Sequence, residues 1–269
     1  MGASVASCLV AGGARAFWCA DGRSPDTVGR AQQAGAEQVD TLDELIDRCD
    51  AIASVCPPGA ATAVAAQVAA CGFDGLYLDA NAIAPSTARA VADTVGQAGA
   101  TTVDGGIVGP PAHQPGTTRL FVSGPMRDDV VTSFAGSAME VVVIDGDVGA
   151  ASALKVAYAT WTKAVGAALL TVRAYADVEG VTDALLDEWH RSQPGTVERS
   201  ELTAAAVGPK AWRFGDELRE LARAMEDADL PGGFQMAAGD VYDRLAPLKD
   251  RAPVDLDEVV ALLVGDGAR

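Results

Sequence analysis

A lysine lies near the start of a long run of small and apolar residues in the middle of the chain. The run covers about 150–178 and has the spacing of a helix, on which Lys155 shares a face with Ser152, Ala159 and Thr162. An amine between two hydroxyls on a helix otherwise suited to burial is able to exchange a proton with a substrate hydroxyl. The alternative is that the lysine merely extends its amine to solvent from a helix start.

Composition restricts the classes of protein to consider. The chain has 269 residues, 49% of them apolar, which predicts a globular protein of one large domain or two ordinary ones. Its net charge of −17 argues against nucleic acid and anionic membrane surfaces as partners. No apolar run is long enough to cross a membrane, and no leader peptide pattern is visible.

The five cysteines lie in about the first quarter of the chain and form no C-x-x-C pair. With His113 and His190 as the only histidines, we expect no metal site. Reduced thiols are typical of a cytoplasmic protein, which is the location we expect.

Strand-like and helix-like segments alternate as far as Gly149, after which the strands stop. Alternation predicts an α/β domain with a mainly parallel, doubly wound sheet, at 1–147. An all-α domain is expected at 148–269. The strand-like segments are Ala16–Ala20, Gln38-Val39, Ala51–Val55, Leu76–Leu78, Thr101–Val103, Thr118–Val122 and Val141–Ile144. The helical patterns after the boundary cover about 150–178, 182–192, 197–207, 210–229, 234–247 and 255–264.

The chain begins directly on a helical segment, Met1–Gly13. In a doubly wound domain the first helix follows a strand and a Gly-rich turn that holds a diphosphate. Met1-Gly2 look like the last two positions of such a turn, so the first strand is expected to be missing. Either the true start codon lies upstream, or the product is trimmed and binds nucleotide poorly.

Four short motifs follow one another at regular places along the chain, at Cys56–Pro58, Asp79–Pro85, Asp104–Pro111 and Gly149–Lys155. Their order resembles the 6-phosphogluconate dehydrogenase-like, or β-hydroxyacid dehydrogenase, superfamily. Lys210–Phe214 supports the branch that has a distinct, mostly uncharacterised helical C-terminal domain. The resemblance covers essentially the whole chain and implies a Rossmann-type dinucleotide-binding domain followed by a helical substrate and dimerisation domain.

The resemblance implies that Lys155 is the general acid and base. In the superfamily this lysine belongs to the pattern G-x-G-x-x-x-K-x-x-x-N, in which Ala151 and Ala159 here replace the second glycine and the asparagine. Loss of the asparagine puts in doubt how the substrate is oriented, and Thr162 or Tyr158 is a possible replacement. Ser152 and Thr162 are further candidates for binding the substrate.

The substrate loop also departs from the superfamily pattern. Asn81 stands where the superfamily has serine, and its amide can both donate and accept near a nicotinamide or a substrate oxygen. Asn81 could instead hold its own turn or cap the following helix. Gly109 could offer a backbone N–H to a carboxylate, although Val108 and Pro110 replace a serine and a glycine, and the alternative is a proline-stiffened turn without a ligand.

The cofactor candidates follow the strand ends. The resemblance places Gly2 at the diphosphate and Cys56-Pro57, with Asn81, beside the cofactor. Arg23 and Ser24 suit the 2′-phosphate of NADP, so we expect NADP rather than NAD. Asp21 in the same turn would instead favour NAD, and an ordinary Asp-Gly turn remains the structural alternative.

In the helical region, Arg213 follows Trp212 and precedes Glu217 by four residues, which predicts a surface ion pair between Arg213 and Glu217. The alternative is that Arg213 binds an anionic group of the substrate. Phe234 is expected in the core.

The resulting prediction is an NADP-dependent oxidoreductase that transfers hydride between NADP and the CH–OH group of a small hydroxy acid, acting as a homodimer. The alternatives are a non-catalytic or impaired nucleotide-binding remnant and an imine reductase-like activity.

Overall fold

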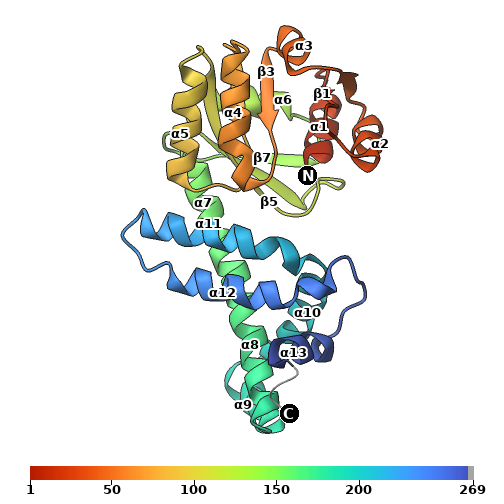
Figure 1. Ribbon diagram of the computed structural model, residues 1–269, viewed down its shortest axis with the longest axis vertical. Coiled ribbons are helices and arrows are strands. Elements are labelled where there is room, and N and C mark those ends of the chain that lie inside the picture. Colours follow the sequence, from red (N-terminus) through yellow and green to blue (C-terminus); the bar gives the residue numbers. More distant parts are fainter. Residues whose placement is uncertain (266–269) are drawn as a thin grey trace. The chain divides into compact units, whose positions relative to one another are not determined.

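The computed structural model describes residues 1–265, which fall into two compact units. The first unit spans Met1–Val156 and the second begins at Ala157. The first is an α/β unit and the second is entirely helical in its described part, so the predicted fold class is confirmed: a mainly parallel Rossmann-type sheet followed by an all-α region (Figure 1).

The main sheet of the first unit has five strands in the order β3-β4-β5-β6-β7. Strands β3, β4 and β5 are parallel, β6 is antiparallel to β5, and β7 is parallel to β6. Its strands are β3 (Ala51–Ser54), β4 (Leu76–Asp79), β5 (Thr101–Val108), β6 (Thr118–Ser123) and β7 (Met139–Val143). The helices of this unit are α1 (Gly2–Ala11), α2 (Pro25–Gln33), α3 (Leu42–Asp47), α4 (Ala61–Ala70), α5 (Pro85–Gly96), α6 (Arg127–Ser133) and most of α7 (Ala150–Ala159).

Two separate hydrophobic cores lie on the two faces of the main sheet. Alternation along β4 directs Leu76 and Leu78 into the core that α1 and α6 cover, and Tyr77 into the core under α4 and α5. Figure 1 shows α4 and α5 side by side over the sheet. The residues after each parallel strand therefore emerge at one edge, between covered faces, where doubly wound sheets bind ligands.

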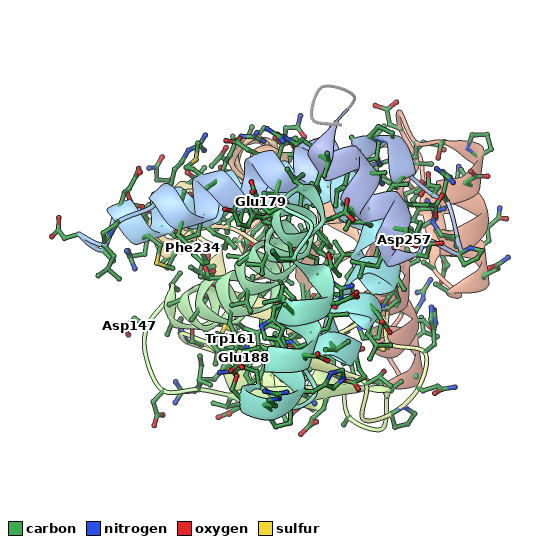
Figure 2. All side chains as sticks on the ribbon, turned by 90° about the horizontal axis from the view of Figure 1, so that it is seen from below. Asp147, Trp161, Glu179, Glu188, Phe234 and Asp257 are labelled. Carbon is green, nitrogen blue, oxygen red and sulfur yellow. The ribbon has the colours of Figure 1, made fainter. Side chains whose placement is uncertain are left out.

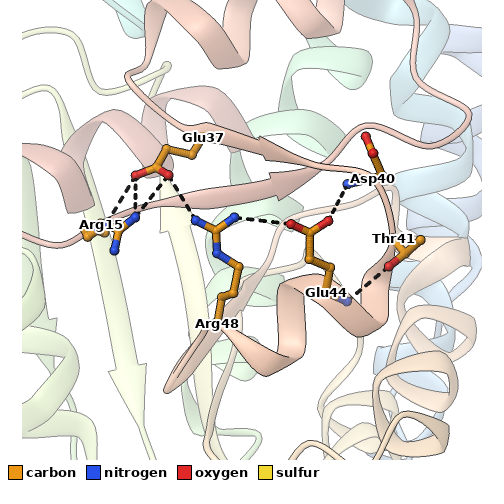
Figure 3. A network of polar contacts seen from close by, with 6 residues as sticks. All are labelled: Arg15, Glu37, Asp40, Thr41, Glu44 and Arg48. Carbon is orange, nitrogen blue, oxygen red and sulfur yellow. Dashed lines mark hydrogen bonds and ion pairs between the residues drawn. The ribbon is translucent and has the colours of Figure 1, made fainter.

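Strands β1 (Phe17–Cys19) and β2 (Glu37–Val39) form a separate parallel pair, and in the described residues no strand joins β1 to β3. The sheet of this unit is therefore in two pieces. Exposed charges brace the smaller piece, because Glu37 binds both Arg15 and Arg48, and Arg48 also binds Glu44 (Figure 3).

The same network settles which residue caps α3. Thr41 has this role, since its hydroxyl accepts the Glu44 N–H at 3.1 Å. The Glu44 carboxylate in turn accepts the backbone N–H of Asp40. Each side chain thus satisfies an amide that the helix leaves unbonded at its start.

Two glycines in β5 allow its backbone to approach its neighbours closely. A Cβ at Gly105 would lie 2.9 Å from the Asp79 carbonyl oxygen, and one at Gly106 would lie 2.8 Å from the Ala151 carbonyl oxygen. The second distance shows that α7 passes directly over β5. The predicted strand 101–103 was too short, since pairing with β6 carries β5 through the glycines to Val108.

The second unit contains the remainder of the long helix and a helical bundle. A π-helical turn, Thr160–Ala164, interrupts the predicted helix 150–178. Its further elements are α8 (Val165–Val178), α9 (Thr182–Ser192), α10 (Thr196–Val207), a 3₁₀ turn at Gly208–Arg213, α11 (Phe214–Glu226), α12 (Gly233–Arg244), a 3₁₀ turn at Ala246–Leu248 and α13 (Leu256–Val264).

Two expectations about this fold were wrong. Phe234 is 55% exposed, because the first turn of α12 directs Gln235 and Ala238 inward instead (Figure 2 labels Phe234). Helix α6 has no counterpart among the predicted elements, since only Val130 in it is buried and its apolar periodicity is correspondingly weak.

Candidate functional site

The start of helix α7 is fastened to strand β5 through one carboxylate, that of Asp104. Asp104 is 1% exposed and accepts the backbone N–H of Gly149 at 2.8 Å and of Ser152 at 2.9 Å. It also accepts the hydroxyls of Ser152 at 2.6 Å and of Ser123 at 3.2 Å. A carboxylate at the amino end of a helix satisfies amides that the helix itself leaves unbonded and interacts favourably with the helix dipole.

Asp104 belongs to a row of polar side chains that crosses four strands. Ser54 pairs in register with Asp79, Asp79 with Asp104, and Asp104 with Ser123. All four are buried. Buried polar side chains are costly unless they bind one another or a ligand, so this row is the most polar part of the sheet interior.

Asp79 is the member of the row with an unsatisfied oxygen. Its Oδ1 accepts the Asn81 N–H at 2.9 Å, whereas Oδ2 has no hydrogen-bond partner among the described residues. Burial raises the pKa of the Asp79 carboxyl from its ordinary 3.8 to about 6; the Asn81 N–H opposes this rise, and the charge of Asp104 adds to it. The Tyr77 hydroxyl is also buried and unpartnered, and burial raises the pKa of Tyr77 to about 12.

Asn81 connects the ends of β3 and β4. Its side-chain carbonyl accepts the Cys56 N–H at 2.6 Å, and its amide donates to the Ser54 hydroxyl at 3.0 Å. Both ends of the 3% exposed side chain are therefore used within the protein. Asn81 holds the Cys56-Pro57 turn to the sheet edge, and its predicted contacts with cofactor and substrate stay predictions.

Lys155 lies at the same edge of the sheet. A Cβ at Gly106 would come 3.1 Å from the Lys155 Cβ, which places the start of the Lys155 side chain over β5. Because Asp79 and Asp104 are register partners in parallel strands, Gly106 and Asn81 each lie two residues further toward the carboxyl edge. Lys155, which the motif spacing singled out in the sequence, thus lies at the sheet edge where doubly wound domains bind ligands.

Three cofactor candidates come from different strand ends of the first unit. The Cβ of Val55, at the end of β3, lies 4.0 Å from the position of a Cβ at Gly2, the first residue of α1. Burial raises the pKa of the neighbouring Cys56 thiol, and the positive charge of Arg23 opposes this rise. Gly2 thus lies beside the residue that precedes Cys56, and the charge of Arg23 acts on the same turn.

These residues fit a dinucleotide. Helix α1 has no acidic residue in its first turn and no side-chain cap, so its amino end is open to an anion. Arg23 is exposed and has no ion pair within residues 1–265. The Ser24 hydroxyl accepts the Thr27 N–H at 3.4 Å, which caps α2, and it shares a hydrogen bond of 3.1 Å with the Thr27 hydroxyl.

The remaining substrate candidates have distinct surroundings. Ser152 is 1% exposed and its hydroxyl is committed to Asp104. Gly109 has a φ of +124° and is exposed, in a turn where Thr118 donates to the Pro110 carbonyl. Thr162 belongs to the second unit, where its hydroxyl donates to the carbonyl of Tyr158. The substrate roles of all three stay predictions.

The predicted ion pair between Arg213 and Glu217 was wrong. Glu217 binds Lys163 instead, at 2.7 Å, in a half-buried pair beside the ring of Phe214. Arg213 lies beside the exposed ring of Trp212, 5.7 Å from its centroid, and Lys249 lies over the same ring. The i, i+4 spacing was a sound indication, but the π-helical turn supplied a closer cation for Glu217.

Sequence reasoning also missed the polar contacts of the π-helical turn. The Tyr242 hydroxyl donates to the Lys163 carbonyl at 2.7 Å, and a Cβ at Gly166 would lie 2.9 Å from that hydroxyl. The unusual glycine inside an apolar helix was the available signal, since it lets a buried tyrosine reach the backbone.

A depression of about 610 Å³ lies at the other edge of the sheet. It is lined by the loop after β6 and by Gly146 and Asp147. Strand β6 runs antiparallel to β5, so its last residues lie toward the amino end of β5, and a Cβ at Gly124 would lie 3.3 Å from the Thr102 carbonyl. This depression is therefore distinct from the edge that carries Lys155.

Two family models match the chain. Residues 1–133 match the NAD binding domain of 6-phosphogluconate dehydrogenase, and residues 176–245 match a domain of unknown function, DUF1932. The chain belongs to the 6-phosphogluconate dehydrogenase-like superfamily. The resemblance stated from the motifs is thereby confirmed, including the distinct helical C-terminal domain. No curated protein sequence matches the chain.

Solved structures share the fold across nearly the whole chain. The Mycobacterium tuberculosis 3-hydroxyisobutyrate dehydrogenase, described with L-serine, has a TM-score of 0.71 and 18% identity and covers 97% of this chain and 94% of its own. A Streptomyces aurantiacus imine reductase has a TM-score of 0.56 and 18% identity, covering 96% and 94%. The reductive aminase from Aspergillus terreus, in complex with NADPH and ethyl-5-oxohexanoate, has a TM-score of 0.57 and 18% identity, covering 96% and 94%.

These comparisons establish the architecture and an NAD(P)-binding domain of the dehydrogenase and reductase type. In residues 1–265, no helix is long and apolar enough to cross a membrane.

Replacing Asp104 by Asn should lower the free energy of unfolding by about 3 kcal/mol, because the amide removes the charge and places a donor against the donors of α7. Urea unfolding followed by circular dichroism measures this change. Asp93→Asn, at an exposed position of α5, is the matched control and should change the free energy by less than about 0.5 kcal/mol. Equal stability of the two variants would show that Asp104 does not anchor α7.

Proposed function

We propose that the protein is an NADP-dependent oxidoreductase that interconverts the CH–OH group of a small hydroxy acid and the corresponding carbonyl group. The observation that carries this proposal is the position of Lys155. Its helix is anchored to β5 by Asp104, and its root lies over Gly106 at the edge that also holds Asn81 and the Cys56 turn.

The residues divide the chemistry between them. A bound nicotinamide would supply the acceptor for the hydride that leaves the substrate carbon. Lys155, as neutral amine, would take the hydroxyl proton during oxidation and return it during reduction. The amide of exposed Gly109 would donate to the substrate carboxylate. The role of Arg213 in binding an anionic group of the substrate stays a separate proposal.

Arg23 and Ser24 support NADP as the cofactor. Arg23 lies at the end of β1, where Rossmann-type domains contact the adenosine ribose, and a guanidinium suits a 2′-phosphate. The reductive aminase with this fold is described with NADPH. Five reduced cysteines in the described residues support a cytoplasmic location.

Imine reduction is the second candidate, favoured by the shared fold of the imine reductase. Ala159 and Val108 also depart from the hydroxyacid dehydrogenase pattern, and both are buried and apolar here. Retention of Lys155 favours alcohol chemistry, since a general base is needed to remove the hydroxyl proton.

A screen of small hydroxy acids and their phosphates with NADP⁺, followed at the NADPH absorbance, tests the proposed function directly. We expect turnover with at least one hydroxy acid and none with amines. Oxidation of amines without oxidation of any hydroxy acid would favour the imine reductase alternative, and failure to bind either cofactor would favour the nucleotide-binding remnant.

We expect Arg23→Ala to weaken NADP⁺ binding roughly tenfold or more, because charge-assisted hydrogen bonds to the 2′-phosphate are lost. Binding of NAD⁺ should change by less than about twofold. Isothermal titration calorimetry measures both, with Arg30→Ala on the exposed side of α2 as control. Equal weakening of both cofactors would contradict the assignment of Arg23 to the 2′-phosphate.

A homodimer through α8 is also proposed. The helix presents an apolar stripe of Val165, Ala168, Val172 and Tyr175, which recur with the spacing of a coiled-coil seam. Tyr175 is 66% exposed and Trp161, in the preceding π-helical turn, is 61% exposed (Figure 2 labels Trp161). A helix stripe related to its own copy by a two-fold axis makes a self-complementary interface.

Sedimentation velocity tests the dimer. Val172→Glu should convert it to a monomer, because two carboxylates would then face each other across the apolar seam. Asp177→Lys, which also changes the charge of α8 but lies off the stripe, should leave the dimer intact. A wild-type protein that sediments as a monomer at all concentrations, or a dimer that tolerates Val172→Glu, would contradict this interface.

A further inference from the structure

We infer that Asp79 is a positioning residue for the cofactor: its carboxyl holds Asn81 and through it the Cys56-Pro57 turn in the shape that accepts the dinucleotide, and its proton keeps a second negative charge away from the diphosphate. The inference rests on the proposed function, because the turn matters only if a dinucleotide binds there. In the sequence, Asp79 was only the first residue of the Asp79–Pro85 motif and had no role of its own. The inference gives it one.

The first step is a chain of hydrogen bonds from the sheet interior to the turn. Asp79 Oδ1 accepts the Asn81 N–H at 2.9 Å. The Asn81 side chain then donates to Ser54 at 3.0 Å and accepts the Cys56 N–H at 2.6 Å. A displacement of Asp79 therefore reaches Cys56 through one intermediate residue, Asn81.

The second step is the environment of Asp79. Asp104 is its register partner on β5, Tyr77 lies on the same face of β4, and Cys56 lies beyond the end of β3. Asp104 carries a charge of the same sign, Lys155 rises from α7 over Gly106 two residues further along β5, and the positive charge of Arg23 acts on Cys56.

The third step follows from the unpartnered oxygen. Asp79 Oδ2 is buried without a hydrogen bond. The hydroxyls of Tyr77 and of Thr102, its register partner on β5, are buried without a hydrogen bond as well. A charged oxygen in such a place is unfavourable, so the proton is kept to a higher pH than usual; the pKa of Asp79 is about 6. Above that pH a second negative charge lies beside Asp104, beneath an edge proposed to hold a diphosphate.

The direction of the pH effect follows from the raised pKa. The folded state binds the proton more tightly than the unfolded chain, so the favourable contribution is complete below about pH 4 and is lost as the pH rises to about 6. Cofactor binding should weaken over the same interval, because ionised Asp79 repels the diphosphate.

Isothermal titration calorimetry with NADP⁺ and NAD⁺ from pH 5 to pH 8 tests the inference. NAD⁺ has no 2′-phosphate, so a pH dependence that both cofactors share cannot come from titration of that phosphate. The wild-type Kd for both cofactors should rise roughly threefold or more across this range, whereas Asp79→Asn and Asp79→Ser should show a flat profile. The serine hydroxyl can still accept the Asn81 N–H two residues on, so this variant keeps the turn without the charge. Asp74→Asn, an exposed carboxyl just before β4, should retain the wild-type profile.

Thermal unfolding supplies a readout without cofactor. The Tm of Asp79→Asn relative to wild type should be higher by about 3 °C or more at pH 8 than at pH 4.5. Cofactor binding whose pH profile is the same in wild type and both Asp79 variants would overturn the inference and leave the proposed function standing. Absence of binding at every pH, in wild type and in Asp74→Asn, would overturn the proposed function and the cofactor role of Asp79 with it.

Discussion

The arrangement of the candidate site depends on the contact between the Asp104 carboxylate and the first turn of α7. Hydrogen bonds from Gly149, Ser152 and Ser123 converge on this one buried side chain. Gly106 completes the arrangement, because only a residue without a side chain lets the helix backbone lie this close to β5. The direction of the helix, and with it the place of Lys155, therefore follows from two positions on one face of β5, Asp104 and Gly106.

The sheet edge near Lys155 is built from polar groups that serve one another. Asn81 and Ser152 looked like ligand-binding residues in the sequence, yet the hydrogen bonds of both side chains are made within the protein. Such residues prepare a site by holding its backbone, so that backbone amides and the exposed Arg23 can meet a ligand. A site of this kind keeps its shape before the ligand arrives, which reduces the entropy lost on binding.

Much of the fold could be predicted from the sequence, because strand and helix patterns alternate clearly and stop at Gly149. The motif order identified the superfamily and directed attention to Lys155. Long-range pairing was beyond such reasoning. Nothing local shows that Glu217 binds Lys163 instead of Arg213, or that β5 continues through Gly105 and Gly106, since both depend on elements distant in the sequence. The burial of Asp79 is of the same kind: its neighbour Asp104 is revealed only by the register of two strands.

The central claim is that Lys155 performs the proton transfer, and single-turnover hydride transfer in Lys155→Met tests it most directly. With a hydroxy acid that the wild-type protein oxidises, the variant should bind NADP⁺ with an unchanged Kd but reduce it at least about a hundredfold more slowly. A variant that binds the cofactor normally and transfers hydride at the wild-type rate would show that Lys155 is not the acid and base.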